Sequence, residues 1–193
     1  LSFYFFNRFF IVVLLRFFQL RPDIAQLEVE GRFTNDPGLA DPRPPLDDAA
    51  FRRLEVQCAD LAMLLRPLLE ARGHRFRTVS DTETILHAYE EYGAGCVDRL
   101  EGMFAFAIYD GRTNTFFATR DRLGKKPFFY SLNQGVLAFS SELPSLRLAP
   151  GWRGDLDLSA LEGYFALGYF LAPSTIYRHA SKLPPGHWLR IAN

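Results

Sequence analysis

The amino-acid sequence predicts an α+β fold that is rich in antiparallel strands. Four short apolar segments follow one another with only turn residues between them: 103–109, 115–120, 127–131 and 136–140. Strands joined by such short turns pair antiparallel. Helical periodicity lies on either side of them, at 82–92 and 159–168, with a short helix expected after Ser141-Glu142 and a last strand at 187–191. Strands and helices are therefore segregated along the chain.

The most distinct helix signal is the sequence SDTE at residues 80–83. A serine followed three residues later by a glutamate is a capping box, so Ser80 and Glu83 are expected to begin the helix at 82–92. Asp81 lies at the positive end of that helix, where a carboxylate is favourable. A carboxylate at a strand-to-helix junction can also bind the ammonium group of a small substrate. The local pattern alone favours the structural interpretation.

Weaker signals precede this helix. Residues 61–71 are apolar at helical spacing and end before Gly73, although Pro67 predicts a break or kink. Residues 75–78 form a candidate strand. Further upstream, residues 31–45 are rich in Pro, Gly and Asp and predict a linker. Either of the two aspartates that follow, Asp47 and Asp48, could cap a helix that continues through Leu54.

The first twenty residues are apolar and aromatic, but Arg8 and Arg16 interrupt them. The uninterrupted apolar stretch at 9–15 is far shorter than the roughly 20 residues of a membrane-spanning helix. A transmembrane helix is therefore not expected. A targeting or membrane-surface role stays open as the alternative to a hydrophobic extension.

Composition excludes some classes of partner. The 22 basic side chains balance 22 acidic ones, so no net field favours nucleic acid or anionic lipid. Two cysteines, Cys58 and Cys96, are too few for a disulfide framework and lack the spacing of a zinc site. We expect both to be buried thiols, which fits a reducing, cytoplasmic environment. The sequence predicts no metal ligand and no catalytic residue.

The charged run RDRLGKKPFFY at 120–130 follows the first predicted hairpin directly. Gly124, Lys125 and Lys126 could bind an anion, but the run lacks the other glycines and the Ser or Thr of a phosphate loop. Arg120, Asp121 and Arg122 could equally form a salt-bridged turn at the end of a strand. The sequence therefore does not predict an ATP site here.

Four motifs follow one another along the chain: SDTE at 80–83, LEGMFAFAIYD at 100–110, RDRLGKKPFFY at 120–130 and LAFSSEL at 137–143. In this order and spacing they closely resemble the glutaminase domain of glutamine-dependent asparagine synthetases, a class II glutamine amidotransferase. The resemblance extends from His74 to Ile191, because residues 155–191 are similar to the segment that leads into the synthetase domain of such enzymes.

The resemblance implies a four-layer α/β/β/α sandwich of the N-terminal-nucleophile hydrolase type. It implies that Asp81 binds the α-amino group of glutamine. The 120–130 run is expected to be structural, and residues 141–143 match the turn into the short helix. The four central strands are expected to lie mainly in one sheet, with helix 82–92 on its outer face. The other sheet is expected to be incomplete on its N-terminal side, because residues 1–60 do not resemble the family.

The N-terminal residues depart from the family pattern. Family members begin with Cys-Gly-Ile, whose terminal cysteine is the nucleophile and whose α-amino group is the base. Here Leu1 stands first, and Cys58 could serve only after cleavage between Gln57 and Cys58. The family's Arg-Gly-Pro-Asp and Asn-Gly-Glu-Ile stretches, which contact glutamine and form the oxyanion hole, are absent as well. We therefore interpret the region upstream of about Leu65 as the product of a frameshift.

The resemblance divides the chain into an atypical head and linker at 1–45, a partial amidotransferase domain at 46–150, and a segment at 151–193 that leads to a missing synthetase domain. ATP, magnesium and aspartate would bind in that missing half, so this chain is expected to bind no cofactor. By itself it is expected to be inactive. Two alternatives remain, a non-catalytic remnant that binds a protein partner and an unrelated β-rich binding domain.

Overall fold

The computed structural model describes residues 4–6, 9–12, 16–19, 26–28 and 61–192. The chain forms two compact units, one of residues 1–32 with 104–193 and one of residues 33–103. Each unit is described by itself. The helix that Asp47 or Asp48 was expected to cap, and Cys58, lie outside the described residues.

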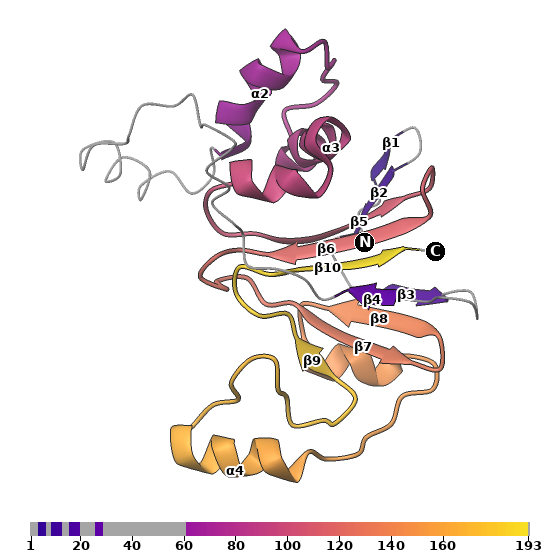
Figure 1. The fold of residues 1–193 in the computed structure, drawn as a ribbon, viewed down its shortest axis with the longest axis vertical. Helices are drawn as coiled ribbons and strands as arrows, with labels where there is room; N and C mark the ends of the chain where they lie inside the picture. Colours follow the sequence, from indigo (N-terminus) through magenta and orange to yellow (C-terminus); the bar gives the residue numbers. More distant parts are fainter. Residues whose placement is uncertain (1–3, 7–8, 13–15, 20–25, 29–60, 193) are drawn as a thin grey trace. The chain divides into compact units, whose positions relative to one another are not determined.

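The unit of residues 33–103 contains the helices α2 (Leu61–Ala71) and α3 (Asp81–Tyr92), followed by the 3-10 helix η1 (Gly93–Arg99) (Figure 1). The α2 helix continues through Pro67, so the predicted break is wrong. Leu65 and Leu69 flank the proline and are buried, and burial of two leucines outweighs one missing backbone hydrogen bond. Gly73 ends the turn after α2 with a φ of 93°.

Residues 75–78 form no strand, so that prediction is also wrong. The backbone N–H groups of Arg77 and Thr78 donate instead to the carboxylate of Glu83 in α3. A side chain thus satisfies the backbone groups that a neighbouring strand would otherwise have bonded.

The other unit contains two antiparallel sheets. One has six strands in the order β1-β2-β5-β6-β10-β4, and the other has four in the order β3-β8-β7-β9. The central strands are β5 (Ala105–Asp110), β6 (Thr115–Arg120), β7 (Phe129–Asn133), β8 (Val136–Ser140), β9 (Ser181–Lys182) and β10 (Trp188–Ala192). The two central hairpins have the registers Ala107↔Ala118 and Ser131↔Ala138.

The prediction that the four central strands share one sheet is wrong. The hairpin β5–β6 lies in the six-stranded sheet and the hairpin β7–β8 in the four-stranded one. The chain crosses between the sheets within residues 121–128. Turn residues specify the two hairpins, but the sheet that each joins depends on partners distant in sequence, since β10 pairs with β6 and β9 with β7.

The two sheets pack face to face around an apolar core, and Figure 1 shows them one over the other. Phe116 of β6 meets Phe139 of β8, with ring centroids 5.1 Å apart, and Phe128 stacks on Phe139 at 5.7 Å. Leu189 and Ile191 of β10 contribute further apolar side chains to this core from the six-stranded sheet. The α+β prediction with two antiparallel sheets is thereby confirmed. The place of α3 outside a sheet stays a prediction.

The N-terminal residues pair within both sheets: β1 (Tyr4–Phe6), β2 (Phe9–Val12), β3 (Arg16–Gln19) and β4 (Gln26–Glu28). β2 pairs with β5, β3 with β8 and β4 with β10. The expectation that one sheet is incomplete on its N-terminal side is therefore wrong, because strands from this region pair in both sheets. This pairing also weighs against the frameshift hypothesis. Aromatic and β-branched residues, which fill β1, β2 and much of β3, have high strand propensity, which explains why these segments pair despite their unusual sequence.

The remaining elements of this unit are the 3-10 helix η2 (Leu143–Leu148) and the helix α4 (Leu158–Leu167). The Asp157 carboxylate caps α4 by accepting the backbone N–H groups of Ser159 and Ala160. Among the described residues, no helix is both long and apolar enough to cross a bilayer.

Candidate functional site

The start of α3 is held by two side chains that act separately. The hydroxyl of Ser80 accepts the backbone N–H of Thr82 at 3.1 Å, as the predicted N-cap requires. Glu83 does not close a reciprocal capping box. Its carboxylate accepts the backbone N–H of Arg77 at 2.7 Å, the backbone N–H of Thr78 at 2.6 Å and the Thr78 hydroxyl. Glu83 thus joins the loop before the helix to the first turn of the helix.

Glu83 is buried and ionised. Burial by itself would raise the pKa of its carboxyl, but the hydrogen bonds from Thr78 and Arg77, together with nearby His87, outweigh burial and hold the pKa below its usual value. A buried carboxylate with several donors is a rigid feature. The loop and helix start that flank Asp81 are therefore fixed relative to each other.

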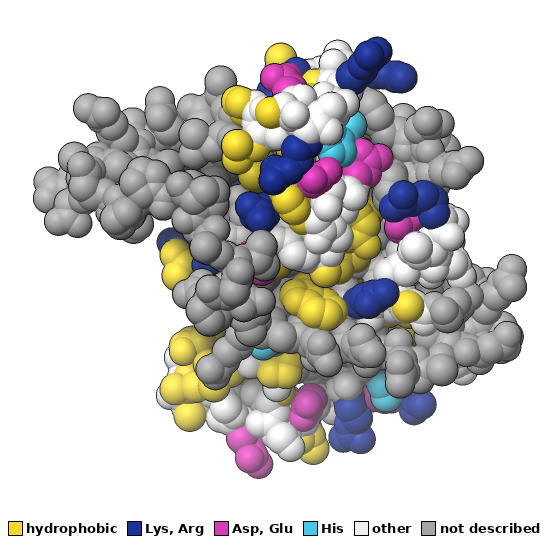
Figure 2. All heavy atoms as spheres, turned by 45° about the horizontal axis from the view of Figure 1, so that its top comes forward, with side chains coloured by type: hydrophobic (Ala, Val, Ile, Leu, Met, Phe, Trp, Pro, Cys, Tyr) yellow, Lys and Arg dark blue, Asp and Glu magenta, His cyan; other side chains and the backbone are white. Residues whose placement is uncertain are grey.

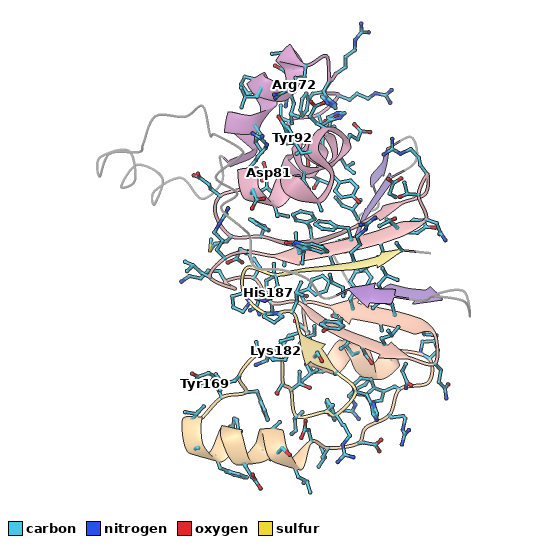
Figure 3. All side chains as sticks on the ribbon, viewed as in Figure 1. Arg72, Asp81, Tyr92, Tyr169, Lys182 and His187 are labelled. Atoms are coloured by element: carbon cyan, nitrogen blue, oxygen red, sulfur yellow. The ribbon has the colours of Figure 1, made fainter. Side chains whose placement is uncertain are left out.

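Asp81 is the first residue of α3 and is exposed. Figure 3 labels it among the helices of this unit. The cap and the Glu83 contacts hold the backbone on both sides of it, so its carboxylate is presented from a rigid position. An exposed, preorganised carboxylate can bind a cationic group without a large ordering cost. The geometry therefore permits the binding role that the resemblance implies.

The loop after β6 is organised around Asp121, which is buried. Its carboxylate accepts the backbone N–H groups of Leu123 at 3.1 Å, Lys125 at 2.9 Å and Lys126 at 3.0 Å. The anion-binding backbone suggested by the Gly-Lys-Lys sequence thus binds an internal carboxylate. These three backbone N–H groups are therefore used within the loop itself.

Arg120 completes the same loop with its guanidinium. Its Nε donates to the carbonyl of Lys126 at 2.7 Å, Nη1 to Leu183 at 2.8 Å and Nη2 to Gly124 at 2.6 Å. Burial lowers the pKa of this guanidinium, and the charge of Asp121 opposes that shift. Arg120 and Asp121 thus both bind backbone groups of the loop. Such contacts define one loop conformation better than an exposed ion pair does.

Cys96 lies in η1 and is fully buried, as predicted. Burial, with a smaller contribution from the charge of Asp98, raises the pKa of its thiol to about 12. A thiol in this state is not a nucleophile near neutral pH.

Sequence reasoning missed one cluster in the helical unit. His74, which follows α2, lies beside His87 and Glu90 of α3. Figure 2 shows histidine and acidic side chains adjoining on the surface of this unit. The detectable signal was the His87-x-x-Glu90 spacing, which places both side chains on one face of a helix.

Comparison with known proteins assigns the chain to a family. The glutamine amidotransferase domain family matches residues 62–193. The chain belongs to this family. It is similar to asparagine synthetase [glutamine-hydrolyzing] 3 of Bacillus subtilis, with 43% identity over 126 residues, 65% of this chain and 20% of that protein. A putative asparagine synthetase [glutamine-hydrolyzing] 2 of Methanocaldococcus jannaschii is 40% identical over 146 residues, 71% of this chain and 28% of that protein.

The predicted family resemblance is thereby confirmed. The chain spans about a fifth of the length of the first two curated relatives, both from Bacillus subtilis. Among solved structures, the glutamine phosphoribosylpyrophosphate amidotransferase of B. subtilis has 25% identity and a TM-score of 0.39 over 45% of this chain and 20% of that one. The family match and the two facing antiparallel sheets agree with the predicted fold class.

Proposed function

We propose that this amidotransferase chain binds glutamine in an asparagine-synthetase-like enzyme, with Asp81 holding the α-amino group. The single observation that carries the proposal is the exposed Asp81 carboxylate at the start of α3, fixed between the Ser80 cap and the buried Glu83. An ammonium group beside the positive end of a helix is disfavoured by the dipole, so a fixed carboxylate is needed there. Asp81 meets that need.

Catalysis requires more than this anchor. Hydrolysis of a side-chain amide by acyl transfer needs a nucleophile, a base and oxyanion donors together. Cys96, the cysteine among the described residues, is buried with a raised pKa, and Cys58 has no free α-amino group. We therefore propose that a polypeptide of this sequence does not release ammonia from glutamine. Binding by this polypeptide should be weak as well: the one charge-assisted hydrogen bond from Asp81 contributes about 1.5–3 kcal/mol, less than the roughly 4 kcal/mol of millimolar affinity.

The test is glutamate release from glutamine, measured on this polypeptide and on a chimera with a Cys-Gly-Ile start and an Asn-Gly-Glu segment. The chimera should turn over, and Asp81→Asn in it should raise KM about tenfold or more, the loss of one charged contact. The matched control is Glu70→Gln, an exposed carboxylate of α2 in the same unit. An unchanged KM in Asp81→Asn would contradict the role of Asp81. Turnover by the unmodified chain that vanishes in Cys58→Ser would reverse the proposed inactivity.

We further propose that α4 packs against the remainder of the parent enzyme. None of its residues is buried, and Phe165 and Leu158 are 82% and 65% exposed. The two are seven residues apart and so lie on one helix face. Lys182 fixes the chain after α4 by donating to the carbonyl of Phe170 at 2.6 Å. Exposed apolar residues grouped in this way are typical of a surface that another domain covers.

Co-expression with a downstream synthetase polypeptide tests this surface. Phe165→Asp should abolish co-purification, whereas Ser159→Asp, which adds the same charge on another face of α4, should not. Loss of association in both variants, or in neither, would contradict the assignment.

ATP and magnesium would bind to the synthetase part of the parent enzyme, not to this chain. We infer a cytoplasmic setting from the asparagine synthesis that the relatives' names state.

A further inference from the structure

The helical unit holds a cluster of two histidines and acidic side chains that the glutamine site does not use. The Nδ1 atoms of His74 and His87 lie 3.1 Å apart. Glu90 Oε2 lies 2.8 Å from the Nδ1 of His87 and 3.6 Å from the Nδ1 of His74. Three potential ligand atoms therefore converge on one point from two separate segments of the chain.

These separations fit a metal ion. Zinc binds nitrogen and oxygen ligands at about 2.0–2.2 Å in a tetrahedron, which places neighbouring ligand atoms about 3.3–3.5 Å apart. The three observed distances, 2.8, 3.1 and 3.6 Å, lie around that value. A small inward or outward movement of each side chain would bring all three atoms into coordination.

We propose that His74, His87 and Glu90 bind a divalent transition-metal ion, Zn²⁺ in the first instance. Two imidazoles with one carboxylate are a donor set that suits zinc and leaves the fourth position open to water. The inference is independent of the proposed glutamine site.

A second layer of side chains orients the ligands. The Nε2 of His74 lies 3.2 Å from Glu91 Oε2, and Glu91 is in turn paired with Arg72 at 3.2 Å. The Nε2 of His87 lies 3.8 Å from the buried carboxylate of Glu83, near it but beyond hydrogen-bond distance. A histidine that binds metal through one nitrogen and faces a carboxylate with the other is the usual arrangement in metal sites.

The site is accessible and spans two elements. The side chains of His74 and His87 are 15% and 12% exposed, and that of Glu90 is 34% exposed. An ion can therefore enter from the Glu90 side. Because His74 follows α2 while His87 and Glu90 belong to α3, bound metal would join the two helices, and binding would stabilise the folded unit.

The experiment uses the full chain without a polyhistidine tag, freed of metal by a chelator and titrated with Co²⁺. We expect one equivalent to give the visible absorption of a tetrahedral Co²⁺ site, Zn²⁺ to displace it, and Zn²⁺ to raise the thermal midpoint. His74→Gln, His87→Gln and Glu90→Gln should each weaken binding at least about a hundredfold. Glu91→Gln should keep the stoichiometry and weaken binding about tenfold, the effect typical of an outer-shell partner.

His179→Gln is the matched control, because His179 also lies beside a carboxylate, 3.2 Å from Asp155, but in the other unit. It should bind Co²⁺ as the parent does. If a histidine variant fails to fold, Glu90→Gln decides, since this side chain is the most exposed ligand. The proposal is overturned by an absence of Co²⁺ binding at micromolar protein, by binding that survives Glu90→Gln, or by thiolate charge-transfer absorption, which would place the ion on a cysteine. Hydrogen bonds alone would then account for the cluster.

Discussion

The Glu83 carboxylate accepts the backbone N–H of Arg77 at 2.7 Å, joining α3 to the loop before it. The neighbouring Thr78 donates to the same carboxylate with both its backbone N–H and its hydroxyl. A single buried side chain thus organises the segment that a strand was expected to occupy. The charge of Glu83 should therefore contribute measurably to the free energy of unfolding.

Replacement of Glu83 by Gln should lower the free energy of unfolding by about 2–3 kcal/mol at pH 7, because an amide replaces a charged acceptor of several hydrogen bonds. The pKa of Glu83 lies below its usual value of about 4.5, so its stabilisation is complete above pH 4.5 and is lost as the pH falls through the folded pKa. Urea unfolding at pH 7 and pH 3 should show the difference between parent and variant shrinking. Glu70→Gln, an exposed control, should cost under about 0.5 kcal/mol at either pH. A pH-independent difference would rule out the charge as the cause.

Asp121→Asn should destabilise the chain by about 2–3 kcal/mol. The carboxylate accepts three backbone N–H groups, and an amide nitrogen would face one of those donors. Denaturant unfolding measures the loss. The matched control is Asp155→Asn, whose carboxylate forms a surface pair with Arg153 at 3.0 Å and should matter little. Equal effects of the two substitutions would show that burial of Asp121 is not decisive.

Gly124→Ala should also destabilise the loop, by about 1–3 kcal/mol. Gly124 has a φ of 62°, and a Cβ there would lie 2.7 Å from Pro185 Cγ and 3.0 Å from Arg120 Cζ. Gly163→Ala in α4 is the opposite case, because nothing lies within 4 Å of its added Cβ. That substitution should be neutral or stabilising by up to about 1 kcal/mol through helix propensity. The thermal midpoint should therefore fall in Gly124→Ala and stay the same or rise in Gly163→Ala, and a fall in both would contradict this account.

Cys96 should resist alkylation in the folded protein. With a pKa of about 12, roughly one thiol in ten thousand is ionised at pH 8, and burial blocks access as well. Iodoacetamide followed by peptide mapping should show no label on Cys96 until denaturant is added. Labelling of the native protein at the rate of a free thiol would mean that η1 opens readily.

Local chemistry in the sequence predicted much of this structure. The strand of residues 115–120 and the helix of residues 61–71 have the predicted bounds, because each is set by its own apolar pattern and by turn residues. The role of Ser80 as an N-cap followed from its spacing to the helix for the same reason. The order of the four motifs was sufficient to predict the family, although no single motif was.

These local patterns could not predict which strands and side chains pair over long distances in the sequence. The sequence by itself determined that two hairpins form, that α3 begins after Ser80, and that Asp81 stands at that helix start. Only the tertiary structure decided that the hairpins join different sheets, that Glu83 binds Arg77 and Thr78, and that His74 meets His87 across thirteen residues. The physical reason is that capping and turn preferences act over a few neighbouring residues. Partners for a strand or a buried charge are instead selected by the packing of the whole unit.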